Sequence, residues 1–241
     1  MTRTAPQVRR RASRNAFDCT LCRELLDAGV SPEQGADFDT GIYDYEYEHA
    51  SNLYRVAAPV DAVHSILAGT VKIVKAEPTG NQRIVRVLRT GDIAEVECIS
   101  SPTFEHTAIA AGSVHACRIP IAWFRQGLAG SVRMQMLLLQ QSLAALKETE
   151  TWSSRLTARA TPIRTRTAQL LLRLRIDAGD RILRFNVDEM AAILNIRPET
   201  VSRVLSDFGR LGIVAKERGS VTAQLYFRGN IAALEKFAQG I

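Results

Sequence analysis

The sequence predicts an α+β chain with an N-terminal antiparallel β-roll, a long dimerisation helix and a C-terminal winged helix-turn-helix. Three observations support this fold class. Short strand-forming runs separated by turns fill residues 39–120, apolar residues recur at heptad spacing from residue 132, and two short amphipathic helices meet at a turn near residue 195.

The length and composition are those of a globular protein with two modest domains. The chain has 241 residues, 46% of them hydrophobic, and no apolar run reaches the roughly 18–20 residues that a membrane span needs. The basic N-terminus is not followed by the apolar core of a secretory signal. We therefore expect a cytoplasmic protein with no membrane partner, whose four cysteines are thiols or ligands rather than disulfides.

Positive charge is concentrated near the two ends of the chain. The net charge is +6, and the segment from Arg155 onward carries fifteen Lys/Arg against eight Asp/Glu. Five further arginines lie within residues 1–16, whereas the stretch between these two basic parts is mildly acidic. It contains Asp37, Asp39, Asp44, Glu46 and Glu48. A basic C-terminal third suits a polyanionic partner such as double-stranded DNA, although basic surfaces also serve only to keep a fold in solution.

Residues 1–16 are expected to form a disordered basic tail, because they hold too few apolar side chains to offset the entropy of ordering. Residues 17–125 are expected to form a sensor domain folded as the β-roll, with turns at 78–81 and 90–92. The strand-forming runs are 53–56, 64–69, 70–77, 82–88, 106–111 and 114–119.

A dimerisation helix is expected over residues 126–160, because an apolar stripe has the spacing of a two-stranded coiled coil. The seam residues are Val132, Met136, Leu139, Leu143 and Leu146, at spacings of 4, 3, 4 and 3. The alternative is a helix that packs only on its own roll, but polar residues flank the stripe over two heptads and favour a seam. The next seam position is Glu150, where like charges would weaken pairing.

Residues 161–241 are expected to hold the winged helix-turn-helix, with the helix pair in 187–214. Asp188 is well suited to cap the first helix. Asn195 tolerates the left-handed backbone of a sharp turn. Pro198 fits the first turn of the second helix, where its missing N–H costs nothing.

The second helix of this pair has one apolar and one polar face. Glu199, Ser202 and Arg203 project from the polar face at its N-terminal end. Such a helix suits the DNA major groove, where arginine bonds guanine and glutamate accepts from cytosine. The polar face alone also suits a solvated helix with a Glu–Arg pair, but the whole pattern favours base reading. The apolar face consists of Val201, Val204, Leu205, Phe208 and Leu211.

A wing is expected after the second helix, where two strand-forming runs meet at a turn near 218–220. Contacts to phosphates fix the position of a protein on DNA without reading the base sequence. The residues expected to contact the DNA backbone are Thr200, Ser206, Arg210, Lys216 and Arg218.

These segments resemble the Crp/Fnr superfamily of transcription regulators. The runs LYRVAAPVDAVHSILAGTVKIVK and TGDIAEVE, the heptad helix and RPETVSRVLSDFGRLGIV follow the family's order and cover most of the chain. The E-x-x-S-R arrangement of Glu199, Ser202 and Arg203 is similar to the Fnr-type recognition helix. The resemblance implies a jelly roll like a cyclic-nucleotide domain, a homodimer that reads a TTGA…TCAA-like palindrome, and contact with RNA polymerase.

The resemblance does not extend to a cyclic-nucleotide site. The family's nucleotide binders carry an arginine followed by serine or threonine for the cyclic phosphate, soon after a Gly-Glu pair. Ala94-Glu95 and His106-Thr107 stand at these positions here. Because Glu105 would repel a phosphate and neutral histidine cannot replace a guanidinium, cyclic AMP is not expected as the effector.

All four cysteines lie in the sensor half. Cys19 and Cys22 have the C-x-x-C spacing that lets two thiolates reach one metal or cluster. The Fnr branch holds a [4Fe–4S] cluster with N-terminal cysteines and one cysteine late in the roll, which Cys117 matches. That branch has three N-terminal ligands and this chain has two, so Cys98 would have to supply the fourth thiolate. The resemblance thus implies a cluster that receives a redox or gas signal.

Other interpretations of the sensor stay open. Cys98 and Cys117 also suit an apolar core, and Cys19 with Cys22 suits a redox dithiol or half of a zinc site. A haem, another small effector, or a vestigial sensor that only holds the dimer are further alternatives. An enzyme is not expected, because the four histidines are scattered and form no metal or nucleophile arrangement.

Overall fold

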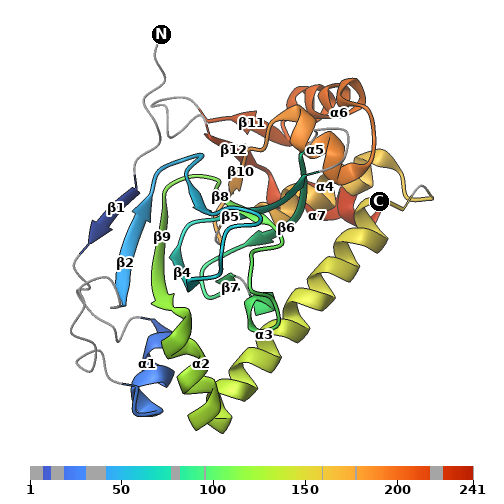
Figure 1. Cartoon of the computed structure of the whole chain (residues 1–241). Helices are drawn as coiled ribbons and strands as arrows, with labels where there is room; N and C mark the ends of the chain where they lie inside the picture. The colour runs from blue at the N-terminus through green and yellow to red at the C-terminus, as the bar shows by residue number, and fades with distance from the viewer. Residues whose placement is uncertain are drawn as a thin grey trace. The chain divides into compact units, whose positions relative to one another are not determined.

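The computed structural model describes residues 8–11, 19–30, 42–76, 82–94, 96–158, 160–176, 178–217 and 225–240. Two compact units divide the chain, one of residues 1–82 and 86–146 and one of 83–85 and 147–241. β-sheets, a long helix and a C-terminal helix-turn-helix confirm the predicted fold class (Figure 1). Along the described residues, no helix combines the length and apolar character needed to cross a membrane.

Two sheets form the roll. One has the strand order β1-β2-β9-β4-β7 and the other β3-β8-β5-β6. Pairing is antiparallel at β1–β2, β2–β9, β4–β9 and β5–β8, so β9 lies in the middle of the larger sheet. The strands are β1 (Val8–Arg11), β2 (Tyr43–Tyr47), β3 (Asn52–Tyr54), β4 (Ala62–Ala68), β5 (Val71–Ala76), β6 (Gln82–Leu88), β7 (Ile93–Ala94), β8 (Thr107–Ala110) and β9 (Val114–Pro120), with a 3₁₀ turn at Val96–Ile99.

The expectation of a disordered tail over residues 1–16 is wrong for β1. Val8–Arg11 pairs antiparallel with β2, with Val8 opposite Tyr47 and Arg11 opposite Asp44. The edge of β2 offers backbone N–H and C=O groups, and pairing with them orders a segment that has few apolar side chains of its own. The remaining residues of the expected tail lie outside the described residues.

A buried aromatic group joins the two sheets. The Tyr54 ring of β3 stacks on Phe104 with a centroid distance of 4.3 Å and lies 6.1 Å from the His64 ring of β4. All three side chains are buried. Stacked rings contribute about 0.5–1.5 kcal/mol beyond their burial, so this group helps to hold the sheets together.

Three helices complete the first unit: α1 (Thr20–Asp27), α2 (Ile121–Gly130) and α3 (Val132–Thr151). Leu25 of α1, Phe124 of α2 and Met134 of α3 are buried in one apolar core. Gly127 lies where these helices approach, and a Cβ there would stand 2.5 Å from both Leu25 Cδ2 and Met134 Sδ. The close approach of α1, α2 and the start of α3 therefore requires a glycine at this position.

The single helix expected over 126–160 is instead two helices followed by a π-helical turn. α2 ends at Gly130, and Ser131 has an extended backbone with φ −134° and ψ 114°. The Ser131 hydroxyl accepts a hydrogen bond from the Met134 N–H at 3.2 Å and so caps α3. α3 ends at Thr151, and the π-helical turn spans Trp152–Leu156. The heptad pattern could not reveal this break, because it reports periodicity and not backbone continuity.

The second unit is a helix-turn-helix with a small sheet of order β10-β12-β11. Arg166 of α4 is buried, and its Nη1 donates to the carbonyls of Leu156 at 3.1 Å and Leu194 at 2.8 Å. These bonds satisfy carbonyls at the ends of two helical segments and fix both against α4. The elements are α4 (Ile163–Arg173), β10 (Arg181–Leu183), α5 (Val187–Leu194), α6 (Pro198–Arg210), β11 (Val214–Lys216), β12 (Tyr226–Gly229) and α7 (Ile231–Gln239).

Two glycines with the same backbone conformation test how tightly the roll is closed. Gly69 and Gly91 have φ of +94° and +93°; a Cβ on Gly69 would stand 2.4 Å from the Ser113 carbonyl oxygen, whereas one on Gly91 would meet nothing within 4 Å. We expect Gly91→Ala to lower the free energy of unfolding by about 1–2 kcal/mol through backbone strain. Gly69→Ala should lower it by roughly 1–3 kcal/mol more. The free energies of unfolding are measured by urea titration. Equal losses for the two variants would contradict the close approach of Gly69 to the Ser113 carbonyl oxygen.

Candidate nucleic-acid interface and cysteine site

α5 begins with a capping box at Asn186 and not with the cap expected at Asp188. Asn186 Oδ1 accepts from the Glu189 N–H at 2.7 Å, and Glu189 Oε2 accepts from the Asn186 N–H at 2.9 Å. The reciprocal bonds satisfy two of the donors that a helix start leaves open. Because the helix begins at Val187, Asp188 lies inside its first turn, where its charge complements the helix dipole.

The turn between α5 and α6 has the predicted geometry. Asn195 is left-handed, with φ 52° and ψ 54°. The next N–H, of Ile196, donates to the Ala191 carbonyl at 3.1 Å, and Ala191 is buried. Pro198 occupies the first turn of α6. These features set the direction in which α6 leaves the turn.

α6 buries one face and exposes the other. Val201, Val204 and Phe208 are buried, and the Phe208 ring lies 5.2 Å from that of Phe237 in α7. Leu205 is half-buried. Leu211 was expected on the apolar face but is 61% exposed, because α6 ends at Arg210 and the helical period stops there.

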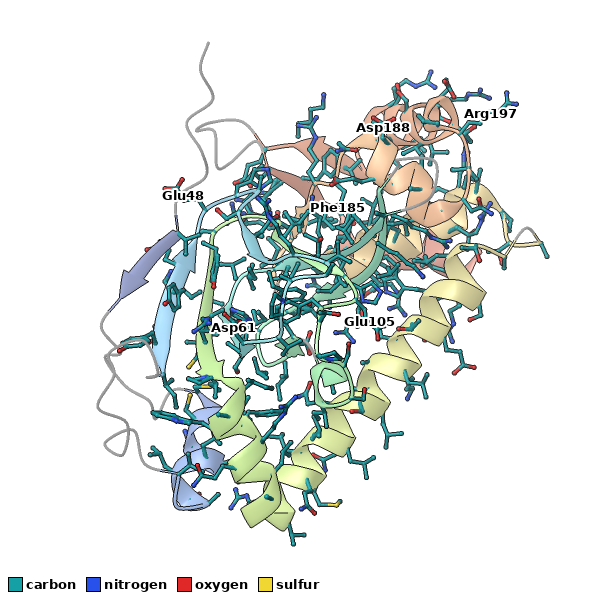
Figure 2. All side chains as sticks on the ribbon, viewed as in Figure 1. Glu48, Asp61, Glu105, Phe185, Asp188 and Arg197 are labelled. Carbon is teal, nitrogen blue, oxygen red and sulfur yellow. The ribbon has the colours of Figure 1, made fainter. Side chains whose placement is uncertain are left out.

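The predicted base-reading residues are all on the exposed face. Glu199, Ser202 and Arg203 are exposed, and Ser206 extends the same face, whereas Thr200 is half-buried. Figure 2 labels Asp188 on α5 and Arg197 directly before α6, with their side chains at the periphery of the unit.

A groove of about 910 Å³ borders this face within the second unit. Ser202 and Ser206 of α6 line one side, and Lys216 of β11 lines it together with Arg184. The exposed face of α6 and the strand that leads into the wing therefore meet around one concave surface. Arg218 and the turn expected at 218–220 lie outside the described residues.

Several cations of the second unit are already paired. Arg210 bonds Asp207, which also accepts from Arg164 at 2.7 Å, and these hydrogen bonds hold the pKa of Asp207 below its usual value. In the wing sheet, Glu217 accepts from Arg181 at 3.1 Å and from Arg228 at 2.9 Å. The Arg210 side chain is 77% exposed although it is paired with Asp207. Its contact with a DNA phosphate stays a prediction.

Arg197 is a cation that the sequence analysis missed. It is the N-cap residue of α6 and is exposed. Within the described part of the chain, neither Arg197, Arg203 nor Lys216 takes part in an ion pair. The available signal was its position directly before Pro198, at the N-terminus of the expected second helix.

The expected seam residues are exposed along α3. In the single chain their exposed fractions run from 49% for Met136 to 74% for Val132. Leu137 and Leu138, between them, pack partly against the apolar core of the first unit. The helix therefore uses one face within its own unit and leaves an apolar stripe uncovered.

Three of the four predicted ligand cysteines converge. Cys19 and Cys22 of the α1 start and Cys117 of β9 are buried, and their sulfurs all lie within 4.8 Å of one another. The Cys22 and Cys117 sulfurs are 3.1 Å apart, and Cys19 Sγ accepts from the Cys22 N–H at 3.4 Å. Figure 2 shows sulfur atoms where α1 meets β9. The side chain of Cys98, the fourth predicted ligand, is not among those described.

The thiols share protons unequally. Hydrogen bonds from Cys117 and then Cys22 lower the pKa of Cys19 to about 3, against the opposing effect of burial. The bond to Cys19 raises the pKa of Cys117, with the bond to Cys22 and burial acting in the same direction. The hydrogen bonds among the three thiols therefore favour the thiolate form more at Cys19 than at Cys117.

Further polar residues lie around the three sulfurs. Asp44 of β2 and Ser65 of β4 are the direct cross-strand neighbours of Cys117. Two residues after Cys22, buried Glu24 pairs through Oε1 with Arg133 Nε of α3 at 2.9 Å. The sequence analysis missed these residues because their role depends on register and packing.

The expected phosphate position of a nucleotide site serves the roll itself. Thr107 Oγ1 accepts a hydrogen bond from the Val56 N–H at 3.1 Å. This bond joins the start of β8 to the segment that follows β3.

Comparisons with known proteins agree with this architecture. The family model for the cyclic nucleotide-binding domain matches residues 46–131, and the Crp-like helix-turn-helix domain matches residues 165–224. The transcriptional regulatory protein btr of Bordetella pertussis is 27% identical over 207 residues, which cover 81% of this chain and 84% of that protein.

Two solved structures match about four fifths of the chain. FixK2 from Bradyrhizobium japonicum has a TM-score of 0.67 at 19% identity, covering 81% of this chain and 96% of its own. The CRP-family regulator TTHB099 from Thermus thermophilus has a TM-score of 0.65 at 19% identity, covering 80% and 96%. At these identities the likeness shows the fold.

The roll, the long helix and the exposed α6 define a transcription regulator that binds DNA through a helix-turn-helix. The chain belongs to the Crp/Fnr superfamily of such regulators. The resemblance seen in the sequence is thereby confirmed.

The capping box gives a direct test of the start of α5. We expect Asn186→Ala to lower the free energy of unfolding of the second unit by about 0.5–2 kcal/mol, because the Glu189 N–H loses its acceptor. Asp188→Ala is the matched control two residues away and should change it by less than about 0.5 kcal/mol. Thermal unfolding followed by circular dichroism measures both. A larger loss of unfolding free energy for Asp188→Ala than for Asn186→Ala would show that Asp188 is the cap, as the sequence predicted.

Proposed function

We propose that this regulator works as a homodimer, reads a TTGA…TCAA-like palindrome, and changes its affinity for DNA in response to a redox or gas signal received by its cysteines. In this proposal residues 17–125 are the sensor, 126–160 the dimerisation segment and 161–241 the DNA-binding domain. Contact with RNA polymerase belongs to the same proposal and rests on superfamily membership alone.

The exposed face of α6 is the observation that carries the proposal. Glu199, Ser202 and Arg203 are exposed together while the opposite face is buried. In a major groove, Arg203 would bond O6 and N7 of a guanine, and Glu199 would accept from a cytosine N4. The uncompensated cations Arg197 and Lys216 would meet phosphates on either side of these base contacts.

The seam supports the homodimer. Five apolar side chains at coiled-coil spacing are exposed on α3, and full burial of such a side chain contributes about 1.5–3 kcal/mol. A twofold dimer presents two recognition helices about one turn of DNA apart, so each subunit would read one half of a palindrome. Glu150 is exposed at the next seam position, where like charges would limit how far the pairing extends.

The cysteine site and the dimer helix share one core. Cys22, Leu25, Cys117 and Met134 are buried together, and Met134 lies in the first turn of α3. The Glu24–Arg133 ion pair ties α1 to the same turn. A change at the sulfurs that moved α1 would therefore also displace the first turn of α3, where the seam begins. A close-packed core transmits such a displacement because it has no free space in which to absorb it.

The described cysteines do not fit the four-iron cluster that the resemblance implies. In a [4Fe–4S] cluster each thiolate binds a different iron, so the ligand sulfurs stand apart on the outside of the cluster. Here three sulfurs lie within 4.8 Å of one another and two are 3.1 Å apart. The proposed signal therefore rests on the thiols themselves, and no step is assigned to a cluster.

Arg203→Ala tests the base-reading face. We expect the dimer to lose about 2–6 kcal/mol of specific binding, which is roughly 30-fold to 10⁴-fold in affinity, because each subunit loses one bidentate contact. Titration of a labelled TTGA…TCAA duplex at moderate salt measures the loss. Arg155→Ala, an exposed arginine before α4, is the control and should bind within about threefold of the parent. Unchanged protection of the palindrome by Arg203→Ala would sink the assignment.

Leu143→Glu tests the seam. Two like charges would face each other across the interface, so we expect the variant to sediment as a monomer while its circular dichroism stays that of the parent. Ala144→Glu places the same charge on the next residue of α3, which is exposed and lies off the stripe, and should remain dimeric. If both variants stay dimeric, the stripe is not the interface.

A further inference from the structure

The three converging thiols come from two places far apart in the sequence. Cys19 and Cys22 lie at the N-terminal turn of α1, and Cys117 lies 95 residues after Cys22 in the middle of the larger sheet. Their exposed fractions are 2%, 0% and 1%. Cysteines that served only as small apolar residues would have no reason to bring their sulfurs together, so the convergence points to a shared ligand.

The spacing of the sulfurs is that of ligands on a single ion. Zinc–sulfur bonds are about 2.3 Å long, so two sulfurs of a tetrahedral site lie about 3.8 Å apart. One pair of sulfurs here is 3.1 Å apart and all three lie within 4.8 Å of one another, a range that is compatible with that value. One ion placed between them would reach all three with small rotations of the side chains.

Local hydrogen bonding already suits a thiolate site. The Cys22 N–H points at Cys19 Sγ at 3.4 Å, a backbone bond that would stabilise a metal-bound thiolate and orient it. The two cross-strand neighbours of Cys117, Asp44 and Ser65, border the site from β2 and β4. The Asp44 carboxylate can accept from a water that completes a fourth coordination position, and the Ser65 hydroxyl can donate to it or accept from it.

We propose that Cys19, Cys22 and Cys117 bind one thiophilic divalent cation of the zinc class, with an exchangeable fourth ligand on the side of Asp44 and Ser65. Three protein ligands with one open position are the arrangement of zinc sites at which a further ligand binds. The ion would tie α1 to β9 and so stabilise the core that reaches Met134 and the start of α3. This inference rests on the proposed function only in taking these cysteines as the sensor.

Metal analysis of the full-length protein tests the site directly. Purified without oxygen and without added metal, the protein should carry about one zinc per subunit and no stoichiometric iron or acid-labile sulfide. Cys117→Ser should lose the zinc, whereas Cys98→Ser, the matched cysteine substitution outside the trio, should retain it. About four irons with sulfide per subunit would overturn the single-ion site. So would a zinc content that Cys117→Ser leaves unchanged.

A cobalt titration keeps the test independent of folding defects in the variants. Parent protein stripped with a chelator and titrated with Co²⁺ should reach an end point near one equivalent, with intense thiolate-to-cobalt charge-transfer bands and the strong visible bands of tetrahedral coordination. Weak bands of an octahedral oxygen site would overturn the proposal.

DNA binding separates this inference from the proposed function. Zinc-loaded and stripped protein are titrated against the same palindrome in parallel with Arg203→Ala. If the protein binds zinc but removal of the zinc changes the affinity for the palindrome by less than about twofold, the metal site is upheld and its role as a sensor is overturned. Absence of any bound metal, with Arg203→Ala still defective, overturns the metal site and leaves the regulator intact.

Discussion

One apolar core governs the first unit, because α1, the central strand β9 and the first turn of α3 all meet in it. Gly127 leaves no space between Leu25 and Met134, so the three helices are held at a fixed separation. Close packing of this kind transmits displacement instead of absorbing it. The core that buries the cysteines therefore also orients the helix that carries the exposed apolar stripe.

In the second unit, contacts on the buried side of α6 hold its polar face toward solvent. Phe208 anchors α6 on α7, the left-handed Asn195 sets its direction, and buried Arg166 bonds the end of α5. Side chains on such a supported helix can meet base edges without paying much ordering entropy at each contact. The paired carboxylates Asp207 and Glu217 leave a smaller set of cations facing outward.

Local signals in the sequence predicted much of this arrangement. The 3.6-residue period placed Glu199, Ser202 and Arg203 opposite a buried face, and the steric tolerance of asparagine located the turn at Asn195. Local signals gave the wrong residue where two side chains could both cap a helix. At the start of α5, Asp188 was expected as the cap and Asn186 is the residue that caps the helix. They missed β1, whose order comes from pairing with β2, and the break at Ser131, which a continuous heptad pattern conceals.

The sequence by itself determined the fold class, the exposed polar face of α6 and the apolar stripe of α3, since each depends on periodicity within a few turns of chain. Only the tertiary structure decided that Cys117 meets Cys19 and Cys22, and that Glu24 pairs with Arg133. Such meetings depend on the register of β9 between β2 and β4 and on how α1 packs against the sheet. Register and packing are set by the whole core, so no local pattern of residues encodes them.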